Sequence, residues 1–372
     1  MKKLVNKTPS LFHRKGEAIV PGDVFENQLT LTLDPSLFLL WSCFVPSFRQ
    51  ADTNKLFWED LGYASQIIPY SFLYNLALSF GVFGLTEYSS KHISIEDTSY
   101  LKPSYAGDTL TAKIFIASAT KNDDGSFSVK TVHFLLNQKG KPVFRLIKNS
   151  IFPKEIPIKE GNAKCPIDYE NSSTFVNHIL SGCTSTQYPP FAKFDVEKNQ
   201  FYIHEMVRTM APCENTFIAT LLKNMHPLAI NPLINEEKSA YLPEGHIVAI
   251  VQAITALEFL EFICPEIEKA TQYKEVKTTS SLSSFSYVMG KEDAEYGFEE
   301  VYIRTFGLDE IDPLSTINIS ELPDGLSENI ETKNDLKNIL TGKNSFLFDH
   351  ICLIMDWKFY RLKQKGSGSF II

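Results

Sequence analysis

Two long apolar segments dominate the hydrophobic pattern of the chain. The first, IIPYSFLYNLALSFGVFGL, covers residues 67–85, and its few polar positions form no polar face. A helix that is apolar on nearly every side belongs in a protein interior, and Pro69 suits a first turn, where a missing N–H costs nothing. The second segment, HIVAIVQAITALEFLEFIC, covers residues 246–264 and has the same character. The pattern predicts two buried helices, one at the centre of each of two folding units.

Runs rich in β-branched and aromatic residues follow each apolar segment. After the first they cover 99–121, 127–138 and 141–152, and after the second they cover 276–290 and 298–308. This composition favours strands, and glycine-containing turns separate several of them. A last apolar stretch, 344–362, reads as a strand or a short helix. A helix followed by an antiparallel meander is the plan of a sheet wrapped round a helix.

The order of these elements repeats, so we expect an α+β protein of two tandem units that form an internal pseudo-dimer. A chain of 372 residues exceeds one ordinary domain. We assign residues 1–155 to the first unit, the proline- and polar-rich stretch 156–199 to a linker, and 200–372 to the second unit. An acidic insertion near 309–345 precedes the final strand. A further helix should begin at Asp34-Pro35, because aspartate caps helix N-termini well.

The charge of the chain narrows its partners. There are 44 acidic residues against 36 lysines and arginines, and the basic residues are scattered, so nucleic acid is not expected as a partner. Six cysteines show no CxxC spacing, which argues against a zinc knuckle and a disulfide scaffold. No apolar run suits a signal peptide or a membrane span. We therefore expect a cytoplasmic protein without a membrane anchor, a metal or a redox cofactor.

The segment Pro103 to Ala112, PSYAGDTLTA, resembles the MaoC-like enoyl-thioester hydratases and dehydratases of the hotdog fold. In that family a P-x-x-x-G-D-T-L strand commonly follows the central helix. The similarity is strongest over residues 50–155, and the second half resembles the tandem double-hotdog members in the order of its elements. The resemblance implies hydration of a 2-enoyl thioester or dehydration of the 3-hydroxyacyl compound, on CoA or an acyl carrier protein. It also implies a monomeric pseudo-dimer or a homodimer.

Family members typically carry a D-x-N-P-[apolar]-H run before the central helix, whose Asp and His hold and deprotonate a water. In the first half Asp52 and Asn54 match that run, but Lys55 replaces the proline and Phe57 replaces the histidine. Phenylalanine cannot transfer a proton. The resemblance makes Asp52, with Asn54, a catalytic candidate, while a turn or cap role explains both residues equally well.

In the second half the proline and the apolar residue of the run are kept, but Asn224 stands at the Asp position and Ala229 at the His position. His226, on the same loop, can supply an imidazole from a shifted place, because its ring titrates near neutral pH. A loop histidine bonded to the backbone is the simpler alternative. Asn224 is a candidate for substrate binding.

The start of each apolar helix carries the other candidates. Free N–H groups there can bind a thioester oxygen as negative charge develops on it. The family commonly has glycine at this place so that substrate approaches the backbone; the second half keeps Gly245, and the first has Tyr70, a candidate for substrate binding only. His246 is a catalytic candidate together with His226, and Glu244 with His246 forms a second acid/base pair. Glu244 can instead merely complement the helix dipole.

Two other functions remain open. Loss of the Asp and His in both halves favours a non-catalytic subunit that binds acyl thioesters or completes a partner. Hotdog thioesterases use a carboxylate on the central helix, and Glu258 is the feature that favours hydrolysis, although a glutamate at a helix edge explains it as well.

Overall fold

The computed structural model describes residues 18–27, 29–169, 172–188, 190, 195–224, 226–234, 238–259 and 262–363. Within these ranges no helix has the length and apolarity needed to cross a membrane. Residues 1–17, for which the sequence suggested no signal peptide, lie outside the described residues.

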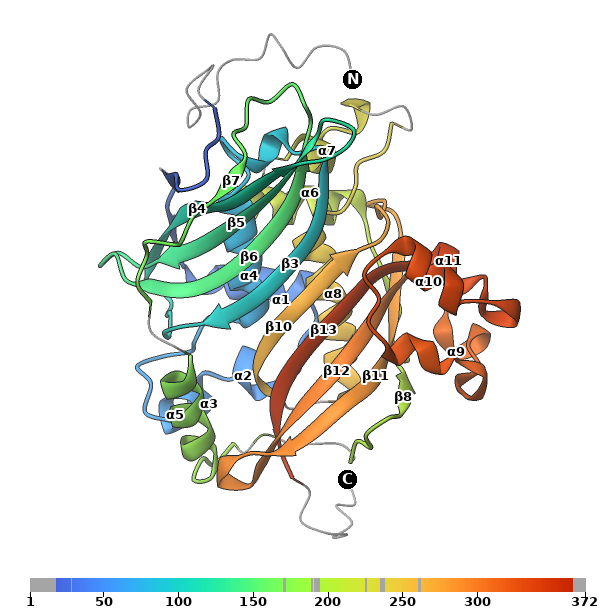
Figure 1. The fold of residues 1–372 in the computed structure, drawn as a ribbon. Helices are drawn as coiled ribbons and strands as arrows, with labels where there is room; N and C mark the ends of the chain where they lie inside the picture. Colours follow the sequence, from blue (N-terminus) through green and yellow to red (C-terminus); the bar gives the residue numbers. More distant parts are fainter. Residues whose placement is uncertain are drawn as a thin grey trace.

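The described strands form one antiparallel sheet that runs through both units (Figure 1). Its order is β1-β4-β5-β6-β3-β10-β13-β12-β11-β8, and the short strands β2, β7 and β9 pair beside this path. The strands are β1 (Val24–Glu26), β2 (Leu31–Thr32), β3 (Lys91–Tyr100), β4 (Thr109–Lys121), β5 (Phe127–Leu136), β6 (Pro142–Phe152), β7 (Gly161–Asn162), β8 (Phe201–Ile203), β9 (Arg208–Thr209), β10 (Ile263–Gln272), β11 (Ser281–Asp293), β12 (Phe298–Asp309) and β13 (Ile351–Leu362).

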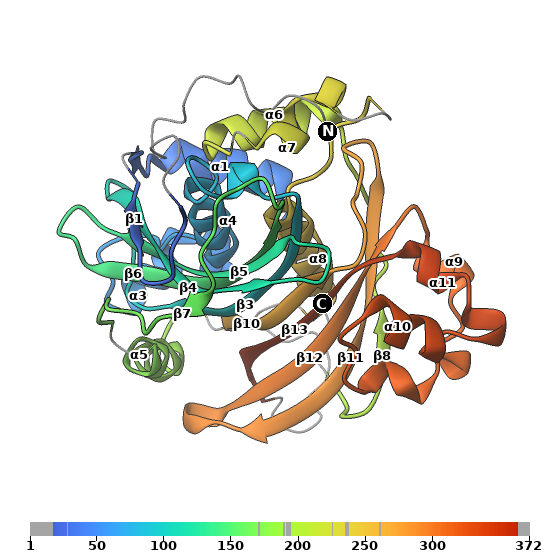
Figure 2. The same cartoon turned by 45° about the horizontal axis from the view of Figure 1, so that its top comes forward.

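Two central helices lie against the concave side of this sheet, one in each unit (Figure 2). They are α4 (Tyr70–Phe80) and α8 (Glu244–Phe259), and every residue of α4 is buried. The helices contact each other where Asn75 Nδ2 donates a hydrogen bond of 3.0 Å to the carbonyl of Gly245. This confirms the expected α+β fold of two tandem sheet-wrapped helices, joined as an internal pseudo-dimer.

Strands β3 and β10 join the units, with Ile95 opposite Ala270 in the antiparallel register. The sequence interpretation is wrong at both strands. Residues 91–98 were assigned to no strand, and the predicted helix 246–264 ends at Phe259, before β10 begins at Ile263. The first helix is also shorter than the predicted 67–85. Both joining strands carry several charged residues, which interrupt the hydrophobic alternation typical of a strand. The end of α8 is hard to recognise in the sequence because the start of β10 is also apolar.

Shorter helices cover the central ones: α1 (Pro35–Phe44), α2 (Gln50–Thr53), α3 (Lys55–Asp60), α6 (Pro212–Leu221) and α7 (Pro227–Ile230). The Asp34 carboxylate accepts a hydrogen bond of 2.9 Å from the Ser36 N–H, which confirms the predicted cap of α1. Trp41 of α1 donates to the Ser71 hydroxyl of α4 at 3.0 Å. In the second unit, α6 and α7 lie above α8 in the same way (Figure 2).

The acidic stretch between β12 and β13 folds into α9 (Pro313–Thr316), α10 (Lys333–Ile339), α11 (Leu347–His350) and three 3₁₀ turns. Buried Leu326, Leu336 and Leu347 pack there in one cluster with Phe306 of β12. The predicted apolar stretch 344–362 is thus a short helix followed by β13. The unit limits 1–155, 156–199 and 200–372 stay a prediction.

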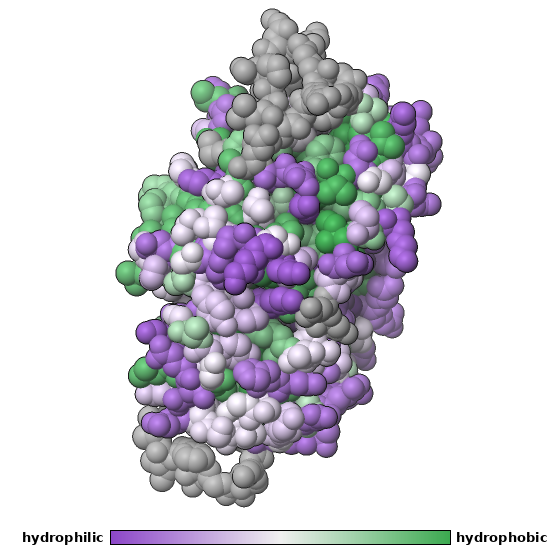
Figure 3. Space-filling view, turned by 90° about the vertical axis from the view of Figure 1, so that its left-hand side faces the viewer, coloured by the Kyte–Doolittle hydropathy of each residue, from purple (hydrophilic) through white to green (hydrophobic). Residues whose placement is uncertain are grey.

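The surface of the first unit mixes hydrophilic residues with small apolar groups (Figure 3). Its exposed large apolar side chains come from separate elements, such as Val24 of β1, Leu39 of α1 and Leu56 of α3. The apolar surface of this unit is therefore mainly turned inward, onto α4.

Candidate functional site

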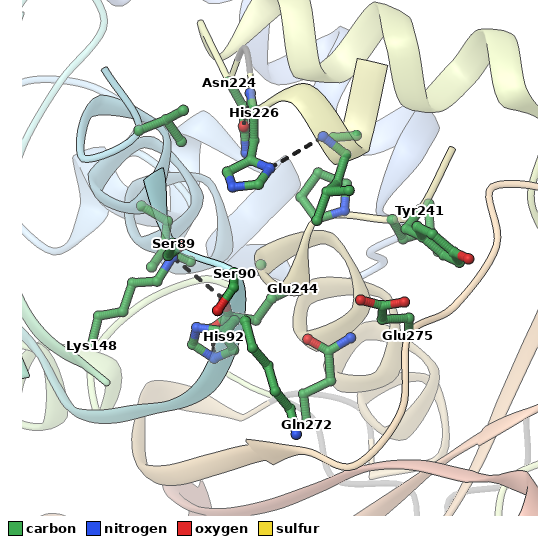
Figure 4. A pocket seen from close by; sticks show the side chains of 18 of the residues that line it. Ser89, Ser90, His92, Lys148, Asn224, His226, Tyr241, Glu244, Gln272 and Glu275 are labelled. Carbon is green, nitrogen blue, oxygen red and sulfur yellow. Dashed lines mark hydrogen bonds and ion pairs between the residues drawn. The ribbon is translucent and has the colours of Figure 1, made fainter. Parts of the chain in front are cut away.

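A cavity of about 370 Å³ lies between the two units at the start of α8 (Figure 4). The first unit contributes the end of α4 and parts of β3 and β6, and the second unit contributes the segment before α8 and the end of β10. The residues that line it are Leu78, Val82, Ser89, Ser90, Lys91, His92, Lys148, Asn224, His226, Leu228, Ala229, Tyr241, Leu242, Pro243, Glu244, Gly245, Gln272, Tyr273, Lys274, Glu275 and Lys333.

A histidine and a glutamate from different units meet in this cavity. His92 comes from the start of β3, Glu244 is the first residue of α8, and the His92 Nε2 lies against the Glu244 Oε1 (Figure 4). A carboxylate only accepts hydrogen bonds, so Nε2 carries the proton and Nδ1 keeps its lone pair. Among the described residues, neither Nδ1 nor Nε2 of His92 has a partner in hydrogen-bond geometry, so the contact of Nε2 with Glu244 is a close approach at ion-pair distance. Burial lowers the pKa of His92, although Glu244 raises it, so the ring is neutral at neutral pH.

Lys148 of β6 lies on the other side of the same carboxylate. Its Nζ is 3.7 Å from the Glu244 Oε2, and its residue is only 8% exposed. A buried carboxylate needs a compensating cation or hydrogen bonds, since an isolated charge is costly in the interior. The His92–Glu244–Lys148 cluster therefore places a buried carboxylate between two basic side chains at the wall of a cavity.

The segment before α8 places two predicted residues in the same cavity. His226 caps α7, because its ring Nδ1 accepts a hydrogen bond of 3.3 Å from the Leu228 N–H. The backbone N–H of His226 donates a hydrogen bond of 3.2 Å to the Asn224 Oδ1. Ala229, at the family's histidine position, also lines the cavity. The simpler alternative, a loop histidine bonded to the backbone, thus holds for the Nδ1 of His226. The ring still faces the cavity (Figure 4).

The start of α8 presents backbone amides to the cavity. The first hydrogen bonds of the helix run from the N–H groups of His246 and Ile247 to the Pro243 carbonyl, so the N–H groups of Glu244 and Gly245 precede the helical ladder. Gly245 lines the cavity, and its role at an oxyanion site stays a prediction. Packing also favours glycine at position 245, because a Cβ there would clash with the Asn75 amide and lie 2.9 Å from the Leu78 Cδ1.

His246 points away from the cavity. Its Nδ1 lies 3.1 Å from the Asn215 Oδ1, whose amide in turn donates to the Ala229 carbonyl at 3.1 Å. The ring packs edge-on against Phe44, and burial lowers its pKa to about 3. Glu244 therefore pairs with His92 and not with His246, which links α8 to the layer of helices above it.

The predicted residues of the first unit lie elsewhere. Asp52 accepts hydrogen bonds from Ser47 at 2.5 Å and from Arg49 Nε at 2.8 Å, and the Asn54 side chain caps α3. The Tyr70 hydroxyl bonds Thr98 and accepts from the Ile267 N–H at 2.9 Å; burial raises its pKa. The structure does not bring Asp52, Asn54 or Tyr70 together with His226.

A small cavity of about 40 Å³ marks the corresponding place at the start of α4. Asp52 and Tyr70 line it, and so do Val176 and Ile179 of α5 (Ser173–Cys183). Ser172, just before α5, donates a hydrogen bond of 3.0 Å to Glu266 of β10. The larger cavity is accordingly the better candidate site.

Glu258 lies in the last turn of α8, about 20 Å from its first turn at 1.5 Å per residue. Its carboxylate accepts from the Glu205 N–H at 3.4 Å, and it does not line the cavity. Within the described residues, no group of three or more His, Cys, Asp or Glu side chains has a metal-binding arrangement.

Sequence reasoning missed His92 and Lys148. Neither belongs to a motif, and both lie in strands whose pairing had to be known before their side chains could be placed beside α8. The one available signal was Glu244, since a carboxylate at the start of a buried apolar helix needs a partner.

Solved structures share this fold, while no protein-family description and no curated protein matches the sequence. A putative MaoC domain dehydratase from Chloroflexus aurantiacus superposes with a TM-score of 0.72 at 14% identity, over 96% of this chain and 99% of its own. A conserved hypothetical double-hotdog protein from Mycobacterium tuberculosis gives 0.65 at 13% identity, over 92% and 96%. A protein described as a MaoC-like dehydratase gives 0.58 at 8% identity, over 92% and 98%. The chain has the double hotdog fold of these proteins, so the resemblance read from residues 103–112 is confirmed for the fold.

Proposed function

We propose that this protein is a hydro-lyase that adds water to a 2-enoyl thioester, or removes it from the 3-hydroxyacyl thioester, in the cavity at the start of α8. The observation that carries the proposal is the buried His92–Glu244 pair beside the free amides of that helix. The double-hotdog neighbours named as dehydratases support the same reaction class.

The chemistry needs one group that takes a proton from water and returns it to carbon. In the proposed tautomer His92 carries its proton on Nε2, which lies against Glu244, and its Nδ1 keeps the lone pair that accepts the proton. In the proposed step the imidazole takes a proton from water, the hydroxyl adds to C3, and the imidazolium returns the proton to C2. Water is thereby added across the double bond, and the enzyme is regenerated.

The thioester oxygen carries negative charge between these two proton transfers. In the proposed pose it lies at the first turn of α8, where the Gly245 N–H and the positive end of the helix dipole stabilise that charge. Asn224 and His226, on the loop before α8, line the cavity and are placed to contact substrate. Asp52 and Asn54 take no part in this pose.

A simple assay tests the reaction class. Purified protein is mixed with crotonyl-CoA, and the loss of enoyl absorbance and the release of free thiol are followed together. Hydration removes the absorbance without thiol release. Glu244→Gln should lower kcat/KM by about 10²-fold or more, because the amide no longer holds the imidazole in one tautomer. The matched control is His178→Gln, an exposed histidine that bonds Tyr63 far from this cavity's lining.

Thioester hydrolysis is a second candidate because Glu244 itself stands beside the free helix amides. A carboxylate there can activate water for attack on the thioester carbonyl. Thiol release in the same assay, abolished in Glu244→Gln, would favour hydrolysis. The absence of both signals over a panel of short and long acyl chains would favour the binding or partner role instead.

A further inference from the structure

We propose that Lys148 is a positioning residue that keeps the His92–Glu244 pair in its working state, with an ionised carboxylate and a neutral imidazole. This inference rests on the proposed function, since it assigns Lys148 a part in the same acid/base step. Lys148 itself has no contact with the reacting atoms in the proposed pose.

The sheet places the ammonium group beside the pair. Lys148 stands opposite Ile95, a core residue of β3, so its side chain starts on the inner face of the sheet. From there the Nζ approaches the Glu244 Oε2 at 3.7 Å, while His92 lies against Oε1. Each carboxylate oxygen therefore has one basic neighbour, and the two come from adjacent strands.

The charges that act on His92 come from two elements. Glu244 of α8 favours the imidazolium, whereas Lys148 of β6 opposes it, and burial opposes it most strongly. His133 of β5 adds no charge, because burial lowers its pKa to about 3, although its hydrogen bond of 3.1 Å to the Ala77 carbonyl acts in the opposite direction. One carboxylate therefore faces two basic side chains, and in the proposal the proton stays on Lys148 rather than on His92.

This division of protons has a chemical consequence. If the ammonium group were absent, Glu244 would have only the imidazole to balance its buried charge, and the pair would gain by protonating His92. A protonated imidazole has no lone pair, so it could not take a proton from water. Lys148 therefore extends the pH range in which the base is available.

The test compares Lys148→Met with the wild type by NMR titration of the histidine side chains. The chain has eight histidines, and the resonance of His92 is identified by its loss in His92→Gln. In Lys148→Met the pKa of His92 should rise by about one unit, the size of effect that a nearby like charge has on a titrating group. Lys148→Arg keeps the charge and should restore the wild-type titration.

The pH profile of kcat/KM supplies the second readout. In Lys148→Met the acidic limb of this profile should move to higher pH by the same amount as the His92 pKa, about one unit. The value of kcat on the alkaline plateau should change much less. The matched control is Lys130→Met, which removes a half-buried lysine of β5 that is paired with Glu96 of β3 at 3.1 Å, and it should move neither readout.

An unchanged His92 titration in folded Lys148→Met would overturn the inference. If that variant fails to fold, Lys148→Gln replaces it, with the same expected rise and the same refuting result. The titration needs no substrate, so the two proposals fail separately. A raised His92 pKa without any turnover contradicts the hydro-lyase proposal only, whereas turnover with an unmoved titration and an unmoved acidic limb contradicts the role of Lys148.

Discussion

Gly245 offers the sharpest test of how the two units pack at the site. In Gly245→Ala the new methyl group meets the Asn75 amide and the Leu78 side chain of α4. Asn75 is held by two hydrogen bonds, to the Ser71 carbonyl at 2.9 Å and to the Gly245 carbonyl at 3.0 Å. Turning it away costs about 2 kcal/mol at about 1 kcal/mol per bond, and the better helix propensity of alanine returns about 1 kcal/mol.

We therefore expect Gly245→Ala to lose about 1 kcal/mol of unfolding free energy, and up to about 3 kcal/mol if Leu78 also fails to adjust. The assay is urea unfolding followed by tryptophan fluorescence. The control is Gly290→Ala, where the nearest atom to a new Cβ is Tyr302 Cδ2 at an ordinary 3.5 Å.

A double-mutant cycle separates packing from any other effect. In Asn75→Ala the clash partner and its two hydrogen bonds are gone, so adding Gly245→Ala to it should cost less than adding it to the wild type, by about 2 kcal/mol. Strict additivity of the two changes would refute the packing account. The glycine at position 245 would then be explained only by the approach of substrate to the backbone, which is what the family resemblance implies.

Three more outcomes follow from the structure. Arg49→Ala should lower the free energy of unfolding, measured with urea, by about 3 kcal/mol, because it leaves the Asp52 carboxylate without its cation. In the control Lys55→Ala, which removes one partner of an exposed ion pair, the free energy of unfolding should change by less than about 0.5 kcal/mol. Ile179→Ala should lose about 2–5 kcal/mol by leaving a hole beside the small cavity, as urea unfolding will measure. Because burial lowers the pKa of His92, wild-type kcat/KM should fall only as pH drops below about 6.5, the ordinary histidine value; a limb above it would contradict the neutral base.

Much of the fold follows from local pattern. The segments around Phe72 and Ile250 are apolar on all sides, and this alone identifies the helices that the sheet surrounds. Asp34 reveals the start of α1 because capping is a local interaction. The joining strands β3 and β10 were harder to find, since residues such as Glu96 and Lys269 interrupt the alternation that marks a strand.

The candidate site is only half visible in the sequence for the same reason. His226 and Gly245 come from one loop and one helix start, so their closeness follows from their position in the chain. His92 and Lys148 reach Glu244 only through the pairing of two units, and no local pattern encodes that contact. Comparison with the family motif pointed to Asp52, but in the structure the Asp52 carboxylate forms an ion pair with Arg49.

The most direct test of the account is the ratio of kcat/KM for crotonyl-CoA hydration between the wild type and His92→Gln. Glutamine keeps a polar side chain beside Glu244 but has no nitrogen that can take up a proton at neutral pH. The account predicts a fall of about 10²- to 10⁴-fold, with an unchanged fold by circular dichroism. Hydration by His92→Gln at the wild-type rate would contradict it and would place the proton transfer on another group.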